Sequence, residues 1–233
     1  MIAKMVVPGV YTIPLGVVNA FLLDDGELTL IDTGTPGSLN KILLAVEELG
    51  KRVTDLKHII ITHLHADHTG SLAAVKKATG ATVYMHPVDA GPFLQGVVMR
   101  PVTPAPLLIY KLLAKLMTGR TSQMTVETTG IDCELSDGQV LDFAGGLQVV
   151  HVPGHAAGQV ALLWPRQGGV LFAADAASNL MRLSWAPIYE DFEEGKRSLR
   201  KLAEMRFETA VFGHGSAITR GADRRFQEKF GAD

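Results

Sequence analysis

The chain has 233 residues, of which 47% are hydrophobic and 20% charged, so it is long and apolar enough to bury a core and is not of the disordered class. Its net charge of −2 argues against a nucleic-acid partner, and its single cysteine, Cys133, excludes an internal disulfide framework. No stretch has the length of a membrane span, and no signal peptide is recognisable, so we expect a cytoplasmic protein without membrane partners.

The first third of the chain predicts strands followed by helices. Short β-branched runs predict strands over 10–15, 17–23 and 28–31, with a hairpin turn at 24–26. A helix is expected over 36–49, where Gly50 ends it, then a strand over 57–61, a helix over 70–79 and a strand over 82–85.

The segment 87–123 interrupts this pattern. Five prolines precede an apolar stretch from Leu107 to Met117, which predicts a helix. We expect this insertion to form a lid or wall over a functional site and to contact an apolar part of a substrate. The alternatives are packing against the body of the protein or against a second copy in a homodimer.

Strands return in the second half of the chain. Runs at 140–143 and 147–152 predict one strand pair, and runs at 160–164 and 170–172 predict another. A helix is expected over 194–205 and a last strand over 209–212.

Seven potential metal ligands follow these predicted strands. Four of them fall within the run Thr62-His63-Leu64-His65-Ala66-Asp67-His68-Thr69-Gly70, and the others come singly at His155, Asp175 and His214. Zinc and similar cations take imidazole and carboxylate ligands, and side chains two apart in an extended segment project to the same side. A polar loop that caps a helix would explain an isolated histidine pair, but four such residues within six positions favour a metal site. We expect His58, His86 and His151 not to be ligands.

This arrangement resembles the metallo-β-lactamase superfamily, whose pattern is a His-x-His-x-Asp-His run followed by a lone His, a lone Asp and a final His. The resemblance implies a single α/β domain over 1–233 with a four-layer αββα sandwich and a helical insertion at 87–123. It also implies two divalent metal ions: zinc is the expected ion, and the same ligands suit iron and manganese. His63, His65 and His155 would hold the first ion, Asp67, His68 and His214 the second, and Asp175 would bridge them. Asp32, in the turn after an early strand, would orient a ligand histidine, with a turn-forming role as the alternative.

Departures from the family's subgroups narrow the expected function. A dedicated β-lactamase is disfavoured by the lack of a recognisable signal peptide and by the acid at position 175. Only nineteen residues follow His214, too few for the helical C-terminal domain of glyoxalase II enzymes. The chain looks most like the short group that includes acyl-homoserine lactonases, although many lactonases carry a histidine where Gln159 stands here.

The expected reaction is hydrolysis of a lactone, thioester or other ester of a small apolar substrate. A hydroxide between the two ions would attack the carbonyl carbon, and Asp67 would orient it and move a proton. Tyr110, Trp185 and Tyr189 are candidates for substrate contact. The alternatives are a mononuclear iron dioxygenase of the persulfide-dioxygenase type and, with less support, a phosphodiesterase or nuclease.

Overall fold

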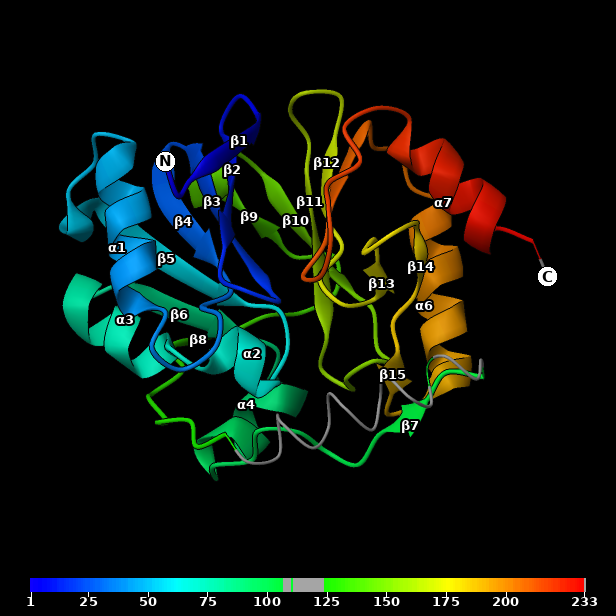
Figure 1. The fold of residues 1–233 in the computed structure, drawn as a ribbon, viewed down its shortest axis with the longest axis horizontal. Helices are drawn as coiled ribbons and strands as arrows, with labels where there is room; N and C mark the ends of the chain where they lie inside the picture. Colours follow the sequence, from blue (N-terminus) through cyan, green and yellow to red (C-terminus); the bar gives the residue numbers. More distant parts are fainter. Residues whose placement is uncertain (107–109, 111–123, 233) are drawn as a thin grey trace.

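Two sheets face each other at the centre of this computed structural model, which describes residues 1–106, 110 and 124–232 (Figure 1). The first sheet has the order β1-β2-β3-β4-β5-β6-β8 and the second the order β16-β12-β11-β10-β9. The strands of the first sheet are β1 (Lys4–Val7), β2 (Val10–Pro14), β3 (Asn19–Asp25), β4 (Glu27–Ile31), β5 (Leu56–Ile61), β6 (Thr82–Met85) and β8 (Cys133–Glu134). The strands of the second are β9 (Val140–Leu141), β10 (Leu147–His151), β11 (Val160–Trp164), β12 (Val170–Phe172) and β16 (Thr209–Val211).

Helices cover the outer face of each sheet. Helices α1 (Leu39–Glu48) and α3 (Leu72–Thr79) pack on the first sheet, and α6 (Phe192–Ala203) and α7 (Ala222–Phe230) pack on the second (Figure 1). Two short helices, α2 (Ala66–Thr69) and α4 (Pro87–Leu94), follow the ends of β5 and β6. The layers are therefore helix, sheet, sheet and helix, which confirms the predicted αββα sandwich.

The sequence produces these layers because apolar side chains alternate along strands that are covered on both faces. Ile59 and Ile61 of β5 pack toward α1 and α3, whereas Ile60 between them packs toward the second sheet. Between the sheets, the Phe21 ring meets the Phe172 ring edge-on, with centroids 5.6 Å apart. One core thus fills the space between the sheets, and two others lie under the helices.

The remaining elements are short and complete the edges. Strands β13 (Ala177–Ser178) and β14 (Ser184–Trp185) form a small hairpin, and β15 (Ile188–Tyr189) pairs with β7 (Thr103–Pro104). Two 3-10 turns are present at Val53–Asp55 and Asp142–Ala144. No helix among the described residues has the length and apolar character that crossing a membrane requires.

The structure differs from the sequence prediction in several respects. Helix α1 begins at Leu39 and not at Pro36, because Gly37 has a φ of 88°, which is incompatible with a helix. The insertion begins with a helix, α4, which the prolines disfavour in the sequence, while its predicted apolar helix over 107–117 lies outside the described residues except for Tyr110. Strand β1 and helix α7 were not predicted.

Candidate metal centre

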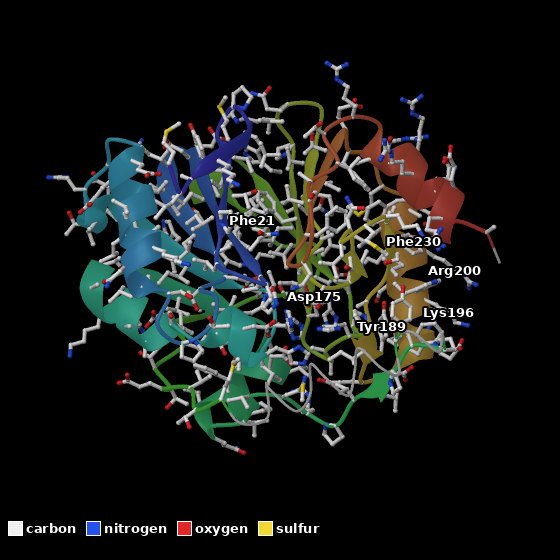
Figure 2. The ribbon with its side chains drawn as sticks, in the orientation of Figure 1. Phe21, Asp175, Tyr189, Lys196, Arg200 and Phe230 are labelled. Carbon is white, nitrogen blue, oxygen red and sulfur yellow. The ribbon has the colours of Figure 1, made fainter. Side chains whose placement is uncertain are left out.

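Seven acidic and histidine side chains meet at one end of the two sheets. Each comes from a loop or a short helix that directly follows a strand. His63, His65, Asp67 and His68 follow β5, His155 follows β10, Asp175 follows β12 and His214 follows β16. Side chains that far apart in sequence meet because the ends of these strands lie at the same edge of the sandwich. Asp175 lies near the centre of the molecule, between its two halves (Figure 2).

The first group consists of His63, His65 and His155, all buried. Nδ1 of His65 lies 3.1 Å from Nε2 of His63 and 3.0 Å from Nε2 of His155. A tetrahedral ion with bonds of about 2.0–2.1 Å separates its ligand nitrogens by roughly 3.3 Å. The three nitrogens therefore stand close to the separation that one zinc-sized ion requires.

The second group consists of Asp67, His68 and His214. Oδ2 of Asp67 lies 3.3 Å from Nε2 of His214 and 4.0 Å from Nε2 of His68. The Asp67 side chain is 15% exposed, more than that of either histidine partner, so solvent reaches the centre on this side. The group can hold a second cation next to a position open to water.

One oxygen of Asp175 lies between the two groups. Its Oδ2 atom is 3.5 Å from Nε2 of His155 in the first group. The same atom is 3.1 Å from Nε2 of His214 and 3.6 Å from Nε2 of His68 in the second. This carboxylate has the geometry of a ligand shared by two ions.

Four of the five histidines are oriented through their other ring nitrogen. Nδ1 of His68 faces Oδ2 of Asp32 at 2.8 Å, and Nδ1 of His63 faces the hydroxyl of Thr62 at 3.0 Å. Nδ1 of His155 and of His214 face the carbonyl oxygens of Ile188 and Val17, at 2.8 and 2.7 Å. These contacts turn each Nε2 toward the centre, as the outer partners of metal-binding histidines do.

Asp32 lies behind His68, and Thr62 lies beside Asp32. Oδ1 of Asp32 accepts a hydrogen bond from the Thr62 amide at 2.9 Å, and the Thr62 hydroxyl donates to Oδ2 at 2.9 Å. Thr62 opens the ligand run, so its position was visible in the sequence. The contributions of Val17 and Ile188 were not, because main-chain carbonyls leave no signal in side-chain identity.

Burial and charge divide the histidines into two kinds. Burial lowers the pKa of His63 and His155, and it lowers the pKa of His65 to about 3. Burial also acts to lower the pKa of His68, but Asp32, Asp175 and Asp67 outweigh it and raise that pKa to about 10. The carboxylates around His214 likewise raise its pKa well above the ordinary value. The first group is thus neutral and ready to bind a cation, whereas a cation in the second group must displace protons.

The carboxylates of the centre stay ionised. Burial acts to raise the pKa of Asp67 and of Asp175, but the surrounding histidines more than compensate, and both values lie below the ordinary range. Ionised oxygens facing imidazole nitrogens form a donor set that suits zinc, iron or manganese.

Several buried polar atoms of the centre lack a partner among the described residues. They are Nε2 of His65, Nε2 of His68 and Oδ1 of Asp175. A buried polar atom without a hydrogen bond is costly, and such atoms in a native protein call for an explanation such as a bound ion. His68 and Asp175 belong, with His63, to one group of potential ligands, so the residues present fit a metal centre.

The backbone near the centre is adapted to close packing. A Cβ atom on Gly213 would overlap Oδ1 of Asp175 and would lie 2.8 Å from the His68 ring. Ala174, just before Asp175, has a φ of 48°, and Asp32 has a φ of 62°. Non-glycine residues rarely adopt this left-handed conformation, and it clusters at functional sites.

The three predicted substrate residues gather in one cluster next to the first group. Tyr110 and Trp185 are partly buried and pack around Tyr189, whose ring meets that of His155 with centroids 6.1 Å apart. Tyr189 is fully buried, and its hydroxyl donates to the Ala176 carbonyl and accepts from the Ala186 amide. The buried Tyr189 thus supports the wall behind His155, and its direct contact with substrate stays a prediction.

Among the described residues, His58, His86 and His151 belong to none of the groups of potential ligands. His58 stacks on Phe143 and faces the carboxylate of Glu27 at 2.7 Å. His86 begins α4 and stacks on His151, with centroids 4.2 Å apart.

Comparisons with known proteins agree with this geometry. The family model described as the metallo-beta-lactamase superfamily matches residues 13–214. The uncharacterized protein YobT of Bacillus subtilis is 29% identical over 226 residues, which cover 90% of this chain and 88% of YobT. A hydroxyacylglutathione hydrolase of Cereibacter sphaeroides is 28% identical over 86% of this chain, which spans 63% of that protein's length.

A solved structure gives the same result for the fold. The metallo-beta-lactamase family protein TTHA1429 of Thermus thermophilus is 29% identical, and the match covers 96% of this chain and 79% of that one with a TM-score of 0.69.

Proposed function

This chain belongs to the metallo-beta-lactamase superfamily, and on that basis we propose that it is a hydrolase that uses two divalent metal ions, expected to be zinc, to cleave a lactone, thioester or other ester. The observation that carries the proposal is the position of Asp175 Oδ2, within 3.5 Å of His155 Nε2 and 3.1 Å of His214 Nε2. A mononuclear site needs no such shared oxygen. The complete second group therefore favours a dinuclear hydrolase over a mononuclear iron dioxygenase.

The ions and the protein have separate roles in this proposal. When bound, two ions in such a centre make hydroxide available near neutral pH and polarise a substrate carbonyl. The protein holds the donors in place: Asp32, Thr62 and two main-chain carbonyls fix four imidazole rings before any ion arrives. Such preorganisation keeps the cost of rearrangement low during the reaction.

Asp67 has a further role because it is the member of the centre most open to solvent. Its ionised carboxylate accepts a hydrogen bond from the attacking water and so fixes the direction of its lone pair. It then passes the released proton toward the leaving alkoxide or thiolate.

The proposed substrate class is an acyl compound with an apolar part. The relative named hydroxyacylglutathione hydrolase supports acyl transfer to water as the reaction type. Tyr110 and Trp185, partly buried beside His155, offer apolar and aromatic surface for the acyl group. The net charge of −2 and the single cysteine agree with a small-molecule substrate and a reducing compartment, and we assign the enzyme to the cytoplasm.

The test combines metal analysis with a substrate panel. Elemental analysis of the untagged protein should give two equivalents of metal per chain. The panel contains a long-chain homoserine lactone, a glutathione thioester, a phosphodiester and a β-lactam, and we expect turnover of a lactone or thioester. Asp175→Ala and His68→Ala should each lose at least one equivalent and activity by at least about 100-fold, more than outer-partner substitutions usually cost. His58→Gln, a histidine remote from the centre, should keep both ions. A single iron without hydrolysis, or full metal content and activity in Asp175→Ala, would overturn the proposal.

A further inference from the structure

Asp89 of α4 is a buried carboxylate outside the seven potential ligands. It is 0% exposed, although a charged side chain is rarely buried completely unless it is paired. Its position four residues after the end of β6 places it beside the loops that carry the first group.

Asp89 joins two of those loops through their backbone amides. Its Oδ2 atom accepts a hydrogen bond from the amide of Leu64, between His63 and His65, at 3.1 Å. Its Oδ1 atom accepts one from the amide of Gly158, three residues after His155, at 3.0 Å. A Cβ atom on Gly158 would lie 2.5 Å from the Asp89 carboxyl carbon, so this position requires glycine. One side chain thus links the loops from both sheets that supply all three histidines of the first group.

Arg100 completes the arrangement. Its Nη2 atom pairs with Asp89 Oδ1. Its Nε atom donates to both carboxylate oxygens of Glu190, to Oε1 at 3.0 Å and to Oε2 at 2.9 Å. Its Nη1 donates to the Val88 carbonyl at 3.3 Å. That carbonyl is the one that Pro92, four residues later, cannot satisfy, because proline has no amide hydrogen. Arg100 therefore compensates for the charge of Asp89 and for the proline inside α4.

Glu190 holds the His155 loop from its other side. Its carboxylate accepts a hydrogen bond from the Ala157 amide at 3.1 Å, and its own amide donates to the His155 carbonyl at 3.3 Å. The loop after His155 is thereby fixed by two carboxylates that share one guanidinium. Such a network restricts backbone movement more than either carboxylate would alone.

We propose that Asp89 is a positioning residue that sets the spacing of the three histidines of the first metal group, with Arg100 as its counter-charge. This inference rests on the proposed metal function. Metal–ligand distances lie within about 0.2 Å of their standard values, so loosening either loop should weaken the binding of the first ion. Among the described residues, no hydrogen bond or ion pair joins Asp89, Arg100 or Glu190 directly to Asp67, His68 or His214, so the affinity for the second ion should depend on this network less than the affinity for the first ion does.

The experiment measures metal affinity, not turnover. The metal-free protein is titrated with Co(II), whose visible absorption reports the coordination geometry, in competition with a chelator. Asp89→Asn removes one acceptor and presents an amide hydrogen to amides that are themselves donors. We expect the first ion to bind about 10–100-fold more weakly and with an altered absorption spectrum, and the second-ion affinity to change less than threefold. Gly158→Ala, which displaces the same carboxylate while keeping its charge, should act in the same direction.

Asp132→Asn is the matched control. Asp132 also accepts a hydrogen bond from a backbone amide, that of Val83, and pairs with the cationic Lys76. Neither of these two contacts reaches a loop that carries a potential ligand. It should lower stability while leaving Co(II) affinity and spectrum unchanged. If Asp89→Asn and Gly158→Ala both fold and bind the first ion with the native affinity and spectrum, Asp89 is only a packing element and the proposal is wrong. If the unmutated protein binds no Co(II), the metal function fails and the positioning role fails with it.

Discussion

Oδ2 of Asp32 lies 2.8 Å from Nδ1 of His68, and both side chains are buried. The contact fixes which nitrogen of His68 faces the second group. Asp32→Asn should therefore lower the affinity for the second ion by about 10–100-fold, because the amide cannot stabilise the imidazole as the carboxylate does. The measurement is a zinc titration of the metal-free protein against a chelator. Asp55→Asn, at the exposed ion pair with Arg52, is the control, and equal zinc affinity in the two variants would contradict the role of Asp32.

Gly213 should tolerate no side chain. A methyl group there would overlap Asp175 and push against the His68 ring, so Gly213→Ala should lose both ions and most activity. Gly91 of α4 is exposed with open space around it, and Gly91→Ala should leave metal content intact. Elemental analysis and chemical denaturation of the two variants check this pair. Native metal content in Gly213→Ala would show that the contact is not needed.

The two ions should respond differently to pH. His68, with a pKa of about 10 in the metal-free protein, carries a proton between pH 6 and 9 that a second ion must displace, and the raised pKa of His214 acts in the same direction. The pKa values of His63, His65 and His155 are lowered, so the first ion displaces fewer protons in that range. Second-site affinity should rise by about tenfold per pH unit for each proton released, while first-site affinity stays nearly constant. Metal content after dialysis at pH 6, 7, 8 and 9 measures this, and loss of both ions together on acidification would speak against it.

Tyr189→Phe should affect stability and not chemistry. Removing the hydroxyl leaves the Ala186 amide and the Ala176 carbonyl without this partner in a buried region, which costs about 1–3 kcal/mol. Urea denaturation measures the loss, and Tyr11→Phe on the partly exposed face of β2 serves as control. A fall in kcat/KM above tenfold in folded, metal-loaded Tyr189→Phe would show that the Tyr189 hydroxyl takes part in the reaction.

The candidate centre was predictable because its residues are unusual. Three histidines and an aspartate within six positions have no common structural explanation. The sandwich was predicted from the resemblance, whereas the division of Ile59, Ile60 and Ile61 between two cores became visible only in the structure.

Helix α4, the role of Asp89 and the burial of Tyr189 depended on contacts between residues far apart in the sequence. Pro92 argues against a helix, and α4 forms because Arg100, eight residues later, binds the carbonyl that the proline leaves free. Asp89 reads as an ordinary helical acid until Leu64 and Gly158 are seen to share it. The burial of Tyr189 was equally invisible, because a tyrosine near the site suits substrate contact and packing alike.

The ligands of the centre are divided between the two halves of the sandwich. The first sheet supplies His63, His65, Asp67 and His68, and the second supplies His155, Asp175 and His214. Each proposed ion would thus be a reversible cross-link between segments about ninety or more residues apart, in a chain whose one cysteine cannot form an internal disulfide. The free energy of metal binding would add to the cost of pulling the sheets apart. The metal supply would then govern how long the folded chain resists proteolysis, as well as how fast it reacts.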